Sequence, residues 1–178
     1  MGYQLIVVVE TNNTNDSDWI YIKETINRFY SYDCAHFKLC RVYMNGKGHY
    51  RDKEKEVVSK IKQYNSAAKN NRSKVIYCFD CDEYDNRKED EVFLNNAKLF
   101  CREKGYGFVW FCKDIERVYL RKKIPDNNKG IEAARFRAKK KINEVDASVL
   151  SADTDKYSAN RSNLLTVLDT LSPFLKRK

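Results

Sequence analysis

The sequence predicts an α/β domain in which helices cover both faces of a four-stranded, mainly parallel sheet. Three observations lead to this prediction. Short runs rich in β-branched and aromatic residues alternate with longer segments whose apolar residues recur at helical spacing. Strand–helix–strand repeats of this kind imply right-handed crossovers and therefore a parallel sheet. The chain has 178 residues, which suffices for one domain with a hydrophobic core and is short for two.

Four segments carry the residues typical of strands. They cover residues 4–9 (QLIVVV), 36–44 (HFKLCRVYM), 74–80 (KVIYCFD) and 106–112 (YGFVWFC). The first is apolar without a break from Leu5 to Val9, as expected for a strand buried on both faces. The second alternates and ends in the glycine-containing turn NGKG.

Helices are expected between these strands. The first follows the polar stretch TNNTNDSD, where Ser17 or Asp16 could cap it. The second covers residues 52–69. The third covers residues 90–105 and stops at Gly105, because glycine readily adopts the left-handed conformation that ends helices.

Beyond Lys113 the pattern becomes helical. The segments are DIERVYLRKK (114–123), IEAARFRAKKKINEV (131–145) and RSNLLTVLDTLSPFL (161–175). We interpret residues 1–125 as an α/β domain and residues 126–178 as a helical C-terminal extension packed on it. The two parts are expected to form one compact unit.

The composition argues against a disordered chain and against a membrane protein. Hydrophobic residues make up 42% of the chain. No run approaches the roughly 20 apolar residues that a bilayer span requires. The first residues, MGYQLIVVVE, lack a basic segment and indicate a buried strand, not a signal peptide. We therefore expect a cytoplasmic protein without a membrane partner.

The net charge of +9 favours a polyanionic partner, and nucleic acid is the expected one. The excess of basic residues lies mainly after residue 117. A lysine-rich surface that is merely well solvated is the alternative. The run ARFRAKKK places Arg135, Lys139 and Lys140 within one or two helical turns around Phe136, which suits contacts to a nucleic-acid backbone.

The six cysteines do not indicate a zinc site. Cys78 and Cys81 form a CxxC pair, but no second pair or nearby histidine completes a ligand set. We expect reduced thiols at all six positions.

Acidic residues follow two of the expected strands. The first strand runs into Glu10, and the third runs into Asp80 and Asp82. In an extended segment Asp80 and Asp82 would point the same way, and Glu10 would join them if the two strands are neighbours. Three carboxylates suit Mg²⁺ or Mn²⁺. Glu83 and Asp85 are possible additional ligands. The alternative is that these acids cap helices or solvate turns.

With these residues the sequence resembles the Toprim domain of topoisomerases, primases and old-type nucleases. It is most similar to the RloB-type and abortive-infection (AbiL-like) Toprim proteins of bacterial phage defence. The matching stretches are VVVETNNTND, KVIYCFDCDE and VWFCKDIERVYL. The resemblance implies a metal-dependent nuclease that uses Glu10, Asp80 and Asp82, with Glu116 matching a later family glutamate. It also implies that an ATPase partner is possible.

One position departs from the family pattern. Thr11 stands where the family has a glycine directly after the first glutamate. Because glycine permits positive φ and a close approach to phosphate, the loop could be reshaped or the site degenerate.

Residues after the second strand are further candidates. Lys47 could stabilise negative charge on a scissile phosphate, and Arg51 could bind nucleic acid beside it. His49 is a candidate general base, with a solvated loop residue as the alternative, and His36 is expected to be structural. The NGKG turn lacks the pattern of a nucleotide-binding Walker loop.

We therefore predict a nuclease that uses Mg²⁺ or Mn²⁺ to cleave DNA or RNA, and the family resemblance implies an antiviral defence effector. A non-catalytic nucleic-acid-binding or adaptor subunit of an ATPase-containing complex is the alternative. Nucleotidyl transfer is a third option, although no dedicated nucleotide site is visible.

Overall fold

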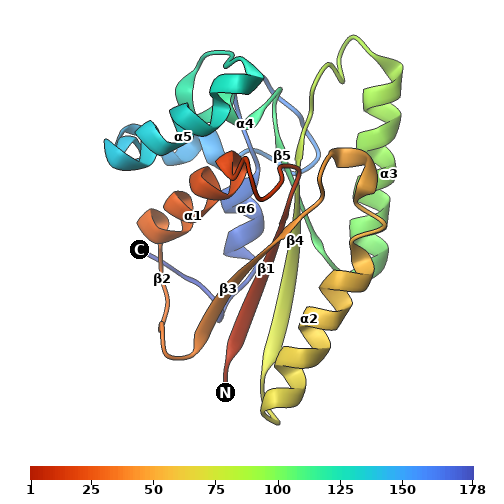
Figure 1. Cartoon of the computed structure of the whole chain (residues 1–178), viewed down its shortest axis with the longest axis vertical. Coiled ribbons are helices and arrows are strands. Elements are labelled where there is room, and N and C mark those ends of the chain that lie inside the picture. Colours follow the sequence, from red (N-terminus) through yellow and green to blue (C-terminus); the bar gives the residue numbers. More distant parts are fainter.

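Four parallel strands form the central sheet in the computed structural model, which describes residues 1–178 (Figure 1). They are β1 (Tyr3–Val9), β3 (Phe37–Tyr43), β4 (Arg72–Asp80) and β5 (Gly107–Phe111), in the spatial order β3-β1-β4-β5. Every neighbouring pair is parallel. The predicted α/β fold is confirmed, and its sheet is wholly parallel. A separate antiparallel pair joins β2 (Tyr30–Ser31) to β6 (Lys176–Arg177).

Helices cover both faces of this sheet, as predicted (Figure 1). One face carries α2 (Glu54–Ala67) and α3 (Lys88–Lys104). The other carries α1 (Ser17–Phe29), α4 (Ile115–Leu120), α5 (Lys129–Ala138) and α6 (Leu164–Asp169). Short 3₁₀ turns are η1 (Lys47–His49), η2 (Asp126–Asn128), η3 (Lys141–Glu144) and η4 (Ala147–Leu150).

Strand β1 contributes side chains to two hydrophobic cores because its side chains alternate between the faces of the sheet. Leu5, Val7 and Val9 enter the core beneath α1, whereas Ile6 and Val8 enter the core beneath α2 and α3. All five are fully buried, which is worth about 1.5–3 kcal/mol for each side chain. The core on the α1 side also holds Leu164 to Leu175, so residues 126–178 share it with the rest of the chain.

The C-terminal helices are shorter than predicted. Helix α4 stops at Leu120 because Arg121 is left-handed, with φ of 59°. Helix α6 begins only at Leu164, because the residues before it form hydrogen bonds with the edge of β5. The Asn163 side chain accepts a hydrogen bond from the Trp110 backbone N–H (2.9 Å) and donates to the Phe108 carbonyl (2.9 Å).

Three smaller expectations can be compared with the structure. Helix α3 ends as predicted, at a left-handed Gly105 with φ of 67°. The expected cap of α1 is wrong, because neither Asp16 nor Ser17 accepts a capping hydrogen bond. Instead, an Asp16 carboxylate oxygen accepts a hydrogen bond from the Tyr43 hydroxyl (2.7 Å). All six cysteines are free thiols.

None of the helices combines the length and the apolar character needed to cross a bilayer.

Candidate functional site

The carboxyl ends of β1 and β4 meet at the point where the strand order reverses. The chain passes from β1 to β3 on one side and returns through β4 to β5 on the other. In open α/β sheets such a point leaves a crevice in which ligands bind. Glu10 directly follows β1, and Asp80 is the last residue of β4. The Asp80 backbone N–H donates to the Glu10 carboxylate at 2.9 Å, so these two predicted residues lie together.

Asp82 does not continue the strand. The prediction that Asp82 points the same way as Asp80 assumed an extended segment, and this assumption is wrong. Strand β4 ends at Asp80, and Asp82 is left-handed with φ of 48°. The Asp82 N–H donates to the Lys113 carbonyl (2.8 Å), which ties this turn to the segment after β5. The side chains separate as a result: Asp82 forms an ion pair with Lys47, whereas Asp80 accepts a hydrogen bond from the Ile115 N–H (3.0 Å). Asp80 thus also caps α4.

Two further carboxyl groups lie beside Glu10 and Asp80. Neither belongs to the trio predicted from the spacing of the acidic residues. Asp18 is in the first turn of α1, and only 9% of it is exposed. Glu116 is in the first turn of α4 and is completely buried, and neither of its carboxylate oxygens has a hydrogen-bond partner. The resemblance to Toprim proteins had pointed to Glu116. The sequence shows that Asp18 is an acid on the helix that follows Glu10. It does not show how the chain turns back so that this helix brings Asp18 beside Glu10.

Together Glu10, Asp18, Asp80 and Glu116 form what we call the acidic cluster. Burial raises the pKa of Glu10 to about 8, that of Asp18 to about 6 and that of Glu116 to about 7. Burial and then the neighbouring Glu10 raise the pKa of Asp80 well above its usual value. The carboxyl groups therefore oppose one another's ionisation in a poorly solvated place.

Lys129 is the basic residue nearest to the acidic cluster. Its Nζ lies 3.7 Å from a Glu116 carboxylate oxygen and 3.2 Å from one of Asp126. Burial lowers the pKa of Lys129, but Glu116 and Asp80 raise it by more, so that the side chain stays charged. Lys129 is the one basic residue at ion-pair distance from the cluster, although Lys47 also lowers the pKa of Glu10, and the raised pKa values mean that the carboxyl groups tend to hold protons. No pattern in the sequence around Lys129 indicated this position.

The NGKG turn places Lys47 at the same edge of the sheet. Gly46 has φ of 107°, a conformation that favours glycine, and its N–H donates to the Glu10 carbonyl at 2.8 Å. Lys47 then reaches both Asp82 and Asp90, at 2.8 Å from the latter. Burial opposes the charge on Lys47, but these two partners outweigh it and raise its pKa. Asp90, in the first turn of α3, is 5% exposed.

A pocket of about 420 Å³ opens above the acidic cluster, and nearly all of its lining is charged. Six basic and six acidic side chains line it, and Ile124 is the one apolar residue. Asp80 belongs both to this pocket and to the acidic cluster. The charged lining residues are Lys47, Asp80, Asp82, Glu83, Arg87, Asp90, Lys113, Asp114, Arg117, Lys123, Asp126 and Lys129.

The predicted additional ligands are already paired. Lys113 forms ion pairs with Glu83 (2.8 Å) and Asp85 (3.1 Å). No three Asp, Glu, His or Cys side chains are arranged to hold a metal ion in this structure. The chemistry of the acidic cluster fits a hard divalent cation, since both buried Glu116 oxygens lack hydrogen-bond partners and Lys129 is the one basic residue at ion-pair distance from the four carboxyl groups. For Asp80 and Asp82 to hold one metal ion together, their side chains would have to turn toward a common point, away from Lys47 and the Ile115 N–H.

The backbone at Thr11 does not adopt the conformation for which the family pattern has glycine. Its φ is not in the positive range, so the backbone does not require glycine there. The Thr11 carbonyl accepts a long hydrogen bond from the Asn45 N–H (3.4 Å), which holds the loop against the NGKG turn.

The other predicted nucleic-acid-binding residues lie outside the charged pocket. The Arg51 guanidinium packs over the rings of Tyr50 and Phe100, 5.2 and 5.3 Å from their centroids. Arg135 pairs with Glu132, and Lys139 and Lys140 follow the end of α5. Phe136 between them is buried and cannot contact a nucleic acid.

The two histidines are exposed and also lie outside this pocket, His49 at the end of the 3₁₀ turn η1 and His36 in the turn before β3. His49 pairs with Asp52 at 3.2 Å, and His36 pairs with Asp33 at 2.6 Å, next to the start of β3. Comparison of the chain with protein-family models, with curated proteins and with solved structures gives no match.

Proposed function

We propose that this protein is a divalent-metal-dependent nuclease that hydrolyses phosphodiester bonds in DNA or RNA. One observation supports it above the others. Four carboxyl groups gather at the switch point of a parallel sheet, with Lys129 at ion-pair distance from one of them, and both Asp80 and Lys129 line a pocket of six basic and six acidic side chains. A cation and a phosphate are the two ligands that such a site would bind together.

Glu10, Asp80 and Asp82 would hold Mg²⁺ or Mn²⁺, and Asp18 and Glu116 would add negative charge around it. When bound, the ion would polarise the phosphoryl oxygen and activate a water molecule. The resemblance of VVVET, FDCDE and the later glutamate to the Toprim pattern supports the same ligands. By that resemblance we also propose a role in phage defence, with an ATPase as a possible partner.

The basic residues of the pocket would bind and orient the substrate. Lys47 lies at the pocket wall between Asp82 and Asp90, and its ammonium group can donate to a phosphate oxygen that carries developing charge. Lys113 and Arg117 line the pocket near β5. The lining contains no aromatic ring, so it suits the sugar–phosphate backbone and offers no surface on which a base could stack.

The test is cleavage of labelled single-stranded DNA, single-stranded RNA and duplex DNA in Mn²⁺ or Mg²⁺. Asp82→Asn is the sharper variant, because Asp82 is 43% exposed at its side chain and caps no helix. Asp80→Asn removes the acid that also caps α4, so its folding must be checked by circular dichroism. We expect both to abolish cleavage, while Glu89→Gln, an exposed glutamate on α3, leaves it unchanged.

A non-catalytic nucleic-acid-binding subunit is the second candidate. It is favoured by the pairing of Asp82 with Lys47 and by the lack of a preformed three-ligand arrangement. Absence of cleavage by the wild-type protein in either ion, together with salt-dependent binding that survives Asp80→Asn and Asp82→Asn, would reject the nuclease and support this second function.

A further inference from the structure

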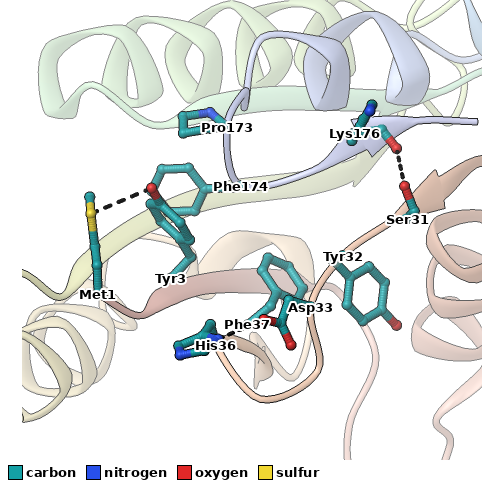
Figure 2. Close-up of a pocket in the computed structure, with 10 residues that line it drawn as sticks. All are labelled: Met1, Tyr3, Ser31, Tyr32, Asp33, His36, Phe37, Pro173, Phe174 and Lys176. Carbon is teal, nitrogen blue, oxygen red and sulfur yellow. Dashed lines mark hydrogen bonds and ion pairs between the residues drawn. The ribbon is translucent and has the colours of Figure 1, made fainter.

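A second pocket lies at the opposite end of the sheet, where β1 and β3 begin (Figure 2). Its volume is about 520 Å³, within the range of pockets that hold small molecules. Three separate stretches of the chain build it: the first residues, the loop from β2 into β3, and the segment that leads into β6. None of the residues in the acidic cluster or the charged pocket lines it.

The walls of this pocket are aromatic. Tyr3 and Phe174 form one pair, with ring centroids 4.5 Å apart, and Tyr32 and Phe37 form another at 4.7 Å. Figure 2 shows the first pair on one side and Tyr32 on the other, with Phe37 between them. Phe37 and Phe174 are buried at the base, whereas Tyr3 and Tyr32 are half-buried and present part of their rings to solvent. Flat aromatic surfaces of this kind favour a flat ligand.

The rim of the pocket carries polar, basic and acidic groups. Lys176 lines it from β6 and forms no ion pair, unlike its neighbour Arg177, which pairs with Asp169 at 3.3 Å. The Ser31 hydroxyl donates to the Lys176 carbonyl (3.3 Å), which fixes the backbone of this residue against β2. On the other rim, the pairing of His36 Nδ1 with Asp33 leaves the second ring nitrogen of His36 without a partner.

From this combination we propose that the pocket binds a nucleobase that carries a phosphate group. The base would lie among Tyr3, Tyr32 and Phe174, and the phosphate would contact Lys176, which forms no ion pair. Stacking on aromatic side chains and attraction of phosphate to a free ammonium group are the two interactions by which proteins hold unpaired nucleotides. The net charge of +9 favours the same ligand. The ligand is either a free nucleotide or one base of a single strand, and both share this chemistry.

The first arm of the experiment is calorimetric titration of the full-length protein with AMP in EDTA. The second is fluorescence polarisation with labelled ten-nucleotide oligothymidylate and with a ten-unit abasic strand that has the same phosphates. We expect Tyr32→Ala to weaken binding of AMP, of the thymidylate strand or of both by about tenfold, and to leave the abasic strand unaffected. Tyr32→Phe keeps the ring and loses only the bond to Asn27, so it should bind like the wild type.

Controls separate this pocket from the rest of the protein. Lys176→Ala should weaken AMP binding severalfold, whereas Tyr106→Ala, which removes a half-buried ring elsewhere, should not change it. Binding of AMP alone identifies a nucleotide pocket, and binding of the thymidylate strand alone identifies a base-binding subsite for single strands. If Tyr32→Ala binds both probes like the wild type, or if neither probe binds better than the abasic strand, the proposal is wrong. Asp82→Asn should retain this binding even where it loses cleavage, so failure of the proposed nuclease is distinguishable.

Discussion

Replacement of Glu116 by glutamine gives the sharpest test of the electrostatics inferred for the acidic cluster. Glu116 is completely buried, both of its carboxylate oxygens lack hydrogen-bond partners, and its nearest cation is Lys129 at 3.7 Å. Burial raises the pKa of Glu116 from 4.5 to about 7, with Lys129 opposing this change. Glutamine has nearly the same shape and cannot ionise.

The magnitude follows from the difference between the folded and unfolded pKa values. Because the folded value is the higher one, the stabilising contribution is present below pH 4.5 and is lost as the pH rises to 7. The difference, 7 − 4.5 or about 2.5, is worth about 3 kcal/mol at 1.36 kcal/mol for each pKa unit. Glu116→Gln should therefore leave stability near that of the wild type at about pH 4.5 and raise it, relative to the wild type, by about 2–3 kcal/mol above about pH 8.

The assay is urea unfolding of both proteins in EDTA at several pH values from 5 to 8.5, so that no divalent ion stabilises the wild type. Glu89→Gln is the matched control, because Glu89 is exposed on α3 and forms no ion pair, and it should show a small effect that does not vary with pH. A difference between Glu116→Gln and the wild type that is the same at every pH would refute the reasoning. It would mean that Glu116 is ionised in the folded protein across this range.

Two further predictions concern the same edge of the sheet. Lys47→Met should destabilise the fold by about 2 kcal/mol at pH 7, because it leaves the buried Asp90 with only the exposed Arg87, at 3.7 Å, as an ion-pair partner. Asp90→Asn in the same chain should restore most of the loss in urea unfolding, and additive losses would contradict this coupling. Binding of Mn²⁺ should strengthen between pH 6 and 8 by up to about tenfold per pH unit, because the ion competes with the proton that Glu10 holds up to a pKa of about 8. Calorimetry in two buffers would count the protons released, and an affinity independent of pH would exclude Glu10 as a ligand.

The sequence predicted the sheet because its signal is local and strong. The runs QLIVVV and Val75–Phe79 are buried on both faces, and few arrangements other than a parallel sheet bury two such faces at once. The position of Glu10 beside Asp80 also followed, since parallel strands bring their carboxyl ends to one edge. The C-terminal helices were less predictable. The residues before Leu164 bind the edge of β5 through hydrogen bonds of the Asn163 side chain, and no local pattern in the sequence predicts this contact.

What the sequence by itself determined is the α/β class, the strands and the pairing of two acids at a strand edge. Only the tertiary structure decided how the charges are distributed there. Alternation along a strand could not foresee that Asp82 would turn toward Lys47, because β4 ends two residues earlier. Nor could it bring Asp18, Glu116 and Lys129 together, because their contacts depend on how α1, α4 and α5 pack on one face of the sheet. Charge interactions depend on distance and burial, and the linear order of residues contains neither.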